Sequence, residues 1–316
     1  MSSSASPIPG LTNANITNIN SLIHHPSLTQ PIIKHIPRSA RAPCAKALAA
    51  ILTKITCDTT DLENWNELLN FGCRNLTVPV KAGKKVSVAS LIRKRLSENQ
   101  NRNRPKENVE AVSGSRRRNK KSTISSVVQS KVGEGNIRAA VRILCSDETL
   151  AENNEKTFKQ LQDKHPAATG SSNSPAPDTP SIQVTEDLTL KAVLSFAAGT
   201  AGGPDGIRPQ HIKDLVLCRE SGAALLTAIT GFTNCLLRGD CPAQVRQVLF
   251  GGNLIAIQKK NGDVRPIAIG YTLRRLAAKC ANMCALPKIA DYLHPIKLGV
   301  GVSGDAKQPY MQLASL

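Results

Sequence analysis

The stretch FGGNLIAIQKKNGDVRPIAIG, residues 250–270, constrains the fold more than any other part of the sequence. Two runs of residues that favour β-strands flank the dipeptide Asn261-Gly262. This dipeptide tolerates the positive φ angles of a two-residue hairpin turn. The sequence therefore predicts a β-hairpin over about 253–269. Because Pro266 has no N–H to donate, its strand is expected at a sheet edge or to be locally irregular.

Three cations, Lys259, Lys260 and Arg265, gather at the tip of this hairpin with only Asp263 to offset them. Lysine offers phosphate a point charge and arginine a two-pronged fork, so such a tip suits phosphate. If two residues form the whole turn, Lys260 lies opposite Asp263. Lys260 and Arg265 then share a face and Lys259 points to the other. A longer loop or a bulge changes this assignment, and a tip that is only solvated is the alternative.

Most of the remaining sequence has helical periodicity. Apolar residues of 44–55 fall on one helical face, and Asp61 is expected to cap a following helix that contains Trp65. Two helices are expected in 135–166, with a break at Ser146.

The last third of the chain has the most regular pattern. Thr185 can cap a helix, Pro209 suits the first turn of another, and a third closes at Gly239. The fold class is therefore α+β, mainly helical, with one hairpin. The expected segments are a disordered leader (1–32), a small helical module (33–80), a flexible basic arm (81–134), a helical segment (135–166), a linker (167–183), the region with the hairpin (184–306) and a tail (307–316).

The segment GPDGIRP, 203–209, predicts a rigid corner between two helices. Gly203 and Gly206 permit close backbone approach, Pro204 stiffens the turn, and Asp205 can accept hydrogen bonds from main-chain N–H groups. An ordinary turn between helices is the alternative to a functional role.

A helix over 271–286 is expected directly after the hairpin. Its apolar and cysteine side chains point inward, and Arg274, Arg275 and Lys279 face elsewhere. A basic helix is thus expected behind a basic hairpin.

The net charge of +18 favours a polyanionic partner, with nucleic acid ahead of a membrane surface. Residues 81–121 hold fourteen Lys and Arg against three Glu, or 14 − 3 = +11. Arg116, Arg117 and Arg118 are expected to neutralise phosphates in a flexible arm, the alternatives being a nuclear-localisation signal or a solvated linker. No run approaches 18 apolar residues, so we expect no membrane span and an intracellular chain of the nucleus, the cytoplasm or both.

Nine cysteines form no CxxC pair, and Cys280 and Cys284 have no further ligands nearby in the sequence. We therefore expect no metal site and no bound cofactor, and buried thiols in a reducing compartment. The sequence contains no HExxH, GxSxG or P-loop pattern.

The order of AGGPDGIRPQHIKDL, LFGGNLIAIQKKNGDVRPIAIGYTLRRLAAK and LHPIKLGVGVSGDA resembles the fingers region of reverse transcriptases of non-LTR retrotransposons. GNIRAAVRILCSDETL and KTFKQLQDKHP resemble the segment just upstream in such polypeptides. The resemblance covers roughly 135–306 and extends to 35–96.

This resemblance implies that Lys259 and Arg265 bind the phosphates of an incoming nucleotide, whereas the register above prefers Lys260 as the partner of Arg265. It also implies that the 203–207 corner shapes the path of the template. The candidates for nucleic-acid binding are Gly203, Asp205, Gly206, Arg208, Arg274, Arg275, Arg116, Arg117 and Arg118.

The family's polymerase reaction needs Mg²⁺ held by palm aspartates, including an Asp-Asp pair. The chain contains no such pair and departs from the family pattern at Lys307; Lys297 stands where relatives commonly show glutamine. We therefore expect a chain truncated before the palm, without polymerase activity, that retains binding of RNA or single-stranded DNA. Alternatives are a basic nucleic-acid-binding or chaperone-like protein, or an open reading frame without selected function.

Overall fold

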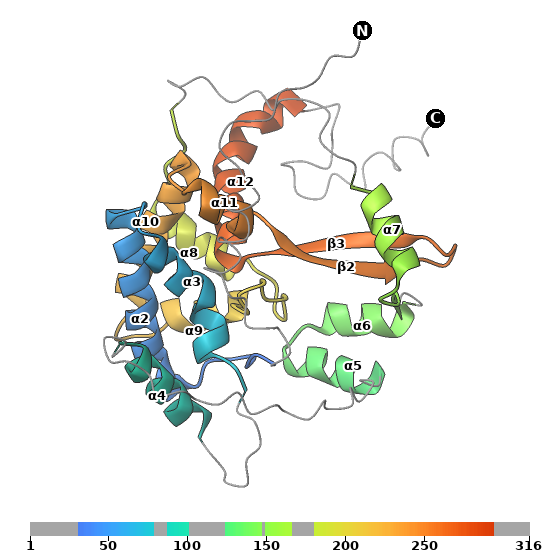
Figure 1. Ribbon diagram of the computed structural model, residues 1–316, viewed down its shortest axis with the longest axis horizontal. Coiled ribbons are helices and arrows are strands. Elements are labelled where there is room, and N and C mark those ends of the chain that lie inside the picture. Colours follow the sequence, from blue (N-terminus) through green and yellow to red (C-terminus); the bar gives the residue numbers. More distant parts are fainter. Residues whose placement is uncertain (1–30, 79–86, 101–123, 147–148, 166–179, 294–316) are drawn as a thin grey trace.

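The computed structural model describes residues 31–78, 87–100, 124–146, 149–165 and 180–293 (Figure 1). Within these ranges the chain is mainly helical with one three-stranded antiparallel sheet, which confirms the expected α+β class. The leader as far as residue 30, most of the linker, and residues 294–316 lie outside the described residues. So do Arg116, Arg117 and Arg118.

One hydrophobic core joins the first described helices to the last. Helix α2 (Arg38–Cys57) packs along α10 (Gly222–Arg238). Trp65 of α3 (Leu62–Asn75) meets Phe232 of α10 in this core; both are fully buried, and their ring centroids are 5.6 Å apart. The other helices that contribute to this core are α4 (Val88–Gln100), α8 (Glu186–Leu194), α9 (Pro209–Val216), α11 (Ala243–Leu249) and α12 (Thr272–Leu293). The boundaries expected at 80 and 184 therefore do not divide the core.

Helix α4 lies where the sequence led us to expect a flexible arm. Ile92 and Leu96 are buried in the core, while the charged residues between them stay outside. Arg95 ties the helix down by donating to the carbonyl oxygen of Thr77 at 2.8 Å. The expectation of a flexible 81–134 was wrong for this part because an amphipathic face, and not the charge density, decides whether a helix docks.

Several predicted helix ends are confirmed. The Asp61 side chain accepts from the N–H of Glu63 at the start of α3, and Thr185 accepts from Leu188 at the start of α8. Helix α10 ends at Gly239, whose φ of 83° is left-handed. These ends follow local chemistry: a short polar side chain supplies an acceptor for an N–H that the helix leaves unpaired, and glycine reverses the chain without strain.

Residues 124–165 build a smaller layer beside the sheet. It contains α5 (Ile124–Gly133), α6 (Ile137–Cys145), the two-residue strand β1 (Thr149–Leu150) and α7 (Glu155–Asp163). Helix α6 ends just before Ser146, as predicted, whereas β1 was not expected. β1 pairs with the outer side of the hairpin, through Thr149 opposite Gln258, and so joins this layer to it.

The predicted hairpin is confirmed as β2 (Gly252–Gln258) and β3 (Val264–Gly270). The strand order is β1-β2-β3, so β3 is an edge strand, as Pro266 led us to expect.

The predicted turn was wrong. Gln258 pairs with Val264 and Ile257 with Arg265, so the loop between the last paired residues is longer than two. The main-chain N–H of Lys259 donates to the carbonyl oxygen of Asp263 at 2.8 Å, and the N–H of Gly262 donates to the carbonyl oxygen of Lys259 at 3.1 Å. These two hydrogen bonds close a three-residue loop. Gly262 has a φ of 81°, while no non-glycine residue in the described ranges has a positive φ. The longer loop is favoured because it places a single residue, glycine, in the left-handed region and leaves Asn261 unstrained.

This loop predicts opposite outcomes for two neighbouring alanine substitutions. Gly262→Ala forces a side chain into a left-handed conformation at a cost of about 1–2 kcal/mol. Amide hydrogen exchange at Lys259 and Gly262 should accelerate roughly tenfold as the tip opens. Asn261→Ala removes only an exposed acceptor for the N–H of Asp263, at 3.2 Å, and should change this exchange much less. Equal effects of both substitutions would favour the two-residue turn instead.

Candidate nucleic-acid interface

The tip of the hairpin places Lys259 and Arg265 on one face. Partners across antiparallel strands share a face, as do residues two apart along a strand. Lys259 lies opposite Asp263, and two residues along the ladder Ile257 lies opposite Arg265. The expected pairing of Lys260 with Arg265 is therefore wrong, because the loop is one residue longer than assumed. Lys260 is exposed in the loop itself.

Asp263 organises this tip. Its carboxylate contacts the ammonium of Lys259 at 2.9 Å and that of Lys164 at 3.0 Å. Hydrogen bonds from Lys259 and then from Lys164 hold the pKa of Asp263 well below its usual range. The group is therefore a carboxylate at neutral pH. It partly neutralises the positive charges of Lys259 and Lys164, which remain partly exposed.

Lys164 is a site residue that the sequence reasoning missed. It follows α7, which packs against β3 near the tip (Figure 1). Nothing in the local sequence of 155–165 distinguishes it from Lys156 or Lys159. Its place depends on the pairing of β1 with β2, which the sequence did not predict.

The 203–207 corner lies at the other end of the hairpin, against the start of α12. A Cβ at Gly203 would lie 2.7 Å from the Cα of Tyr271, so only glycine permits this approach. Thr272 donates through its hydroxyl to the carbonyl oxygen of Ile207. Asp205 accepts from the N–H of Ile207 at 3.1 Å, as predicted. The corner and the root of the hairpin are thus one packed unit.

Gly203, Asp205 and Gly206 are buried in that unit. Gly206 has a φ of 77°, and a Cβ there would meet the side chain of Ile32. Burial raises the pKa of Asp205 to about 7. These positions favour the alternative of a structural corner for the three residues, because buried atoms do not reach a strand outside.

The arginines predicted for nucleic-acid binding surround the root and are half-buried. Arg275 donates to the carbonyl oxygen of Ala201 at 2.7 Å, and the guanidinium of Arg274 lies over Gly270. Arg208 precedes α9. The inward face expected for α12 is confirmed by the buried Leu276 and Cys280. The predicted residues therefore separate into a tip group and a root group at opposite ends of a seven-residue strand, roughly 20 Å apart.

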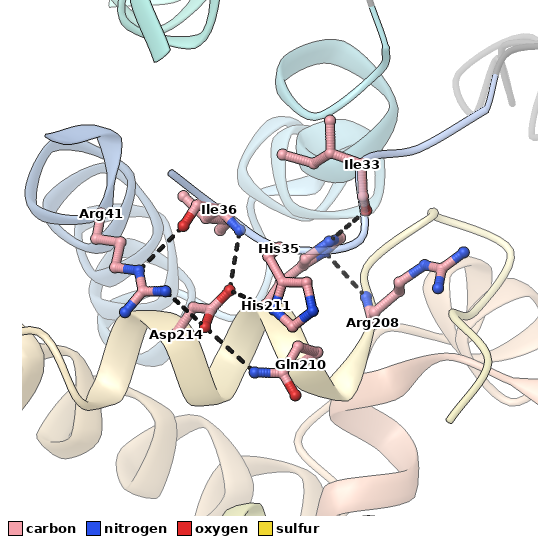
Figure 2. Close-up of polar contacts among 8 residues, drawn as sticks. All are labelled: Ile33, His35, Ile36, Arg41, Arg208, Gln210, His211 and Asp214. Atoms are coloured by element: carbon pink, nitrogen blue, oxygen red, sulfur yellow. Dashed lines mark hydrogen bonds and ion pairs between the residues drawn. The ribbon is translucent and has the colours of Figure 1, made fainter. Parts of the chain in front are cut away.

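A polar network in Figure 2 fastens the first described residues to α9, close to the root. Asp214 accepts from Ile36 N–H at 2.9 Å and from the guanidinium of Arg41 at 2.9 Å. Gln210 donates to the same carboxylate at 3.2 Å. The carboxylate is almost fully buried, so these donors compensate its loss of water.

His211 completes this network as a neutral ring. Its Nδ1 accepts from the N–H of Arg208 at 3.1 Å, and its Nε2 therefore carries the proton donated to the carbonyl oxygen of Ile33 at 2.8 Å. Burial lowers the pKa of His211 to about 4. The ring thus caps the first turn of α9 and is buried there.

No cluster of ligands able to hold a metal occurs among the described residues. The cysteines are all free, but Cys57 and Cys145 are exposed, so the expectation of buried thiols was wrong for these two. Both are the last residues of their helices, where the packed face ends. Among the described helices, none combines the length and the apolar character needed to cross a bilayer.

Comparisons with protein-family models, curated proteins and solved structures found no significant match to this chain. The resemblance described above is therefore carried by the order and content of its motifs alone.

The buried Asp205 predicts a pH-dependent effect of Asp205→Asn. The unfolded carboxyl titrates near 4 and the folded one near 7, so the cost of burying the charge grows as pH rises through this interval, by roughly 1 kcal/mol per pH unit. The asparagine variant should match the parent in urea unfolding at pH 4 and be more stable at pH 8. His211 acts in the opposite direction in both proteins, so it cancels in the comparison. A difference that is equal at both pH values would contradict this account.

Proposed function

We propose that this chain contains the fingers region of a reverse transcriptase of the non-LTR retrotransposon type, and that its hairpin tip binds phosphate groups. The observation that carries the proposal is the register of the hairpin. It brings Lys259 and Arg265 to one face. These are the two residues that the motif resemblance assigns to the phosphates of an incoming nucleotide.

The geometry of the tip supports phosphate binding on physical grounds as well. Lys259 is held on a short hairpin by Asp263, so less conformational entropy is lost when a ligand binds it than for a lysine in a disordered arm. Arg265 projects from the same face two residues further along the ladder and is exposed. A compact ammonium next to a planar guanidinium is a combination that suits the oxygens of a polyphosphate or a strand backbone.

The root of the hairpin supports a second contact with nucleic acid. Arg208, Arg274 and Arg275 keep part of their surface exposed around a rigid corner. The chain as a whole carries a net charge of +18, which draws a polyanion to both ends of the hairpin. In this proposal the buried Gly203, Asp205 and Gly206 have a structural role: they fix the direction in which the hairpin leaves the core.

The 316 residues contain no Asp-Asp pair, so the proposal assigns them binding and not nucleotidyl transfer. Binding through lysine and arginine needs no Mg²⁺. Purified protein with primed RNA, Mg²⁺ and nucleotides should give no extension product.

The charge of the chain favours a second candidate, a basic nucleic-acid-binding or chaperone-like protein that uses the same surfaces without any polymerase role. Because residues 81–121 carry +11, this candidate places most of the affinity there. The two candidates differ in whether the hairpin tip recognises nucleoside triphosphate.

Substitutions at the tip test the proposal with a matched change in charge. Lys259→Ala and Arg265→Ala should each weaken binding of a fluorescent single-stranded RNA, or of a labelled nucleoside triphosphate, about threefold to tenfold. Lys260→Ala removes the same charge from the loop and should change affinity less than twofold. Equal losses for all three variants would mean that only total charge matters.

Salt dependence tests the electrostatic basis of strand binding. The logarithm of affinity should fall linearly with the logarithm of salt concentration, with about 0.7 added to the slope for each phosphate neutralised. Deleting 101–121 should lower the slope, and this deletion is preferable to 81–121 because Ile92 and Leu96 of α4 belong to the core. Retained triphosphate binding after deletion supports the first candidate; loss of all binding supports the second. An affinity independent of salt would exclude both.

A further inference from the structure

The carboxylate of Asp263 joins two ammonium groups that come from distant parts of the chain. Lys259 is four residues away on the same hairpin, whereas Lys164 is 99 residues away in the sequence. The three side chains are about one-third exposed, so solvent and ligands reach them.

The position of Lys164 is set by several contacts and not by the salt bridge alone. β1 pairs with β2, and the N–H of Ala151 donates to the carbonyl oxygen of Ala256 at 3.0 Å. Asn154 then caps α7 by accepting from the N–H of Thr157 at 2.9 Å. Lys164 follows the last residue of that helix, where the partial negative charge of the helix end favours a cation. The fold thus delivers this lysine to the tip of the hairpin.

The tip is rich in cations. Asp263 faces Lys259 and Lys164, and Lys260 and Arg265 add two more cations on the same short element. Each oxygen of the carboxylate lies within 3.0 Å of an ammonium, in the manner in which a phosphate would accept from both. An oxyanion that entered the tip would find two cations already held near one point.

We propose that Lys164 is a phosphate-binding residue of the tip, and that Asp263 is its internal counter-ion, which holds Lys164 and Lys259 together until a phosphate replaces it. This inference rests on the proposed function of the tip and extends it to a residue outside the hairpin. The ligand chemistry is a phosphate oxyanion, supplied by a nucleoside triphosphate or by the backbone of a single strand. Exchange of one acceptor for another needs no covalent step.

Asp263 then competes with the ligand. Salt bridges at this exposure are weak, but both are released when phosphate binds, so the carboxylate lowers affinity several-fold relative to a tip without it. The same contacts reduce the entropy lost when the lysines are ordered by the ligand. The two effects oppose one another, and competition dominates because both ammonium groups are engaged by the carboxylate.

The first experiment measures binding of a labelled nucleoside triphosphate and, separately, of a single-stranded oligonucleotide without a triphosphate. Lys164→Ala should weaken binding of at least one probe about threefold or more. Lys159→Ala removes the same charge from an exposed position of α7 and should have less than a twofold effect. Equal results for these two variants with both probes would overturn the inference. The probe that responds identifies the source of the phosphate.

The second experiment tests the counter-ion. Asp263→Asn should tighten binding at least threefold relative to Asp163→Asn, which makes the same change in charge at an exposed position of α7. This gain should shrink when Lys164→Ala is combined with it, because the two residues act through one contact. An Asp263→Asn variant that binds no more tightly than Asp163→Asn, or a gain independent of Lys164, would overturn the role of Asp263.

Failure of this inference is distinguishable from failure of the proposed function. If Lys259→Ala and Arg265→Ala weaken binding while Lys164→Ala does not, the tip binds phosphate without α7. If none of the three has an effect beyond Lys260→Ala, the tip is not a phosphate site. Circular dichroism of each variant should match that of the parent, because the substituted side chains are exposed or half-exposed.

Discussion

The close approach of the 203–207 corner to the start of α12 is the constraint on which the rest of the candidate interface depends. At Gly203 the distance from a hypothetical Cβ to the backbone of Tyr271 is 2.7 Å, which no side chain tolerates. Gly72 of α3 approaches the same corner even more closely, since a Cβ there would lie 2.3 Å from the carbonyl oxygen of Asp205. Backbone therefore packs on backbone from two sides, and the direction of the hairpin is fixed where it leaves the core.

This arrangement explains why charged and buried parts of the interface lie at different places. At the root, the 203–207 corner is buried, and Asp205 accepts a hydrogen bond from the N–H of Ile207. The nearby carboxylate of Asp214 is likewise buried and hydrogen-bonded within the protein. The tip extends beyond the main core and keeps its charges accessible. The proposed phosphate site needs cationic side chains that are held in place before the ligand binds. The rigid corner at the base of the hairpin supports such pre-organisation at its tip, whereas charges on a mobile base would lose it.

Several parts of the fold followed from local sequence, and others did not. The hairpin itself, the caps at Asp61 and Thr185 and the end of α10 at Gly239 were predicted, because each depends on a few neighbouring residues. The register was not, since a two-residue and a three-residue loop contain the same Asn261-Gly262 dipeptide. One residue of difference moved Lys259 instead of Lys260 to the face of Arg265.

The sequence by itself determined the helices outside the predicted basic arm 81–134, the place of the hairpin and the basic character of its tip, because periodicity, turn residues and charge are local properties. Only the tertiary structure decided that α2, α3 and α4 share a core with the C-terminal helices, that Gly203, Asp205 and Gly206 are buried, and that Lys164 meets Asp263. These outcomes depend on which faces pack together across tens to hundreds of residues. Burial of apolar surface selects that packing, and the contribution of any single residue to it has no local signature.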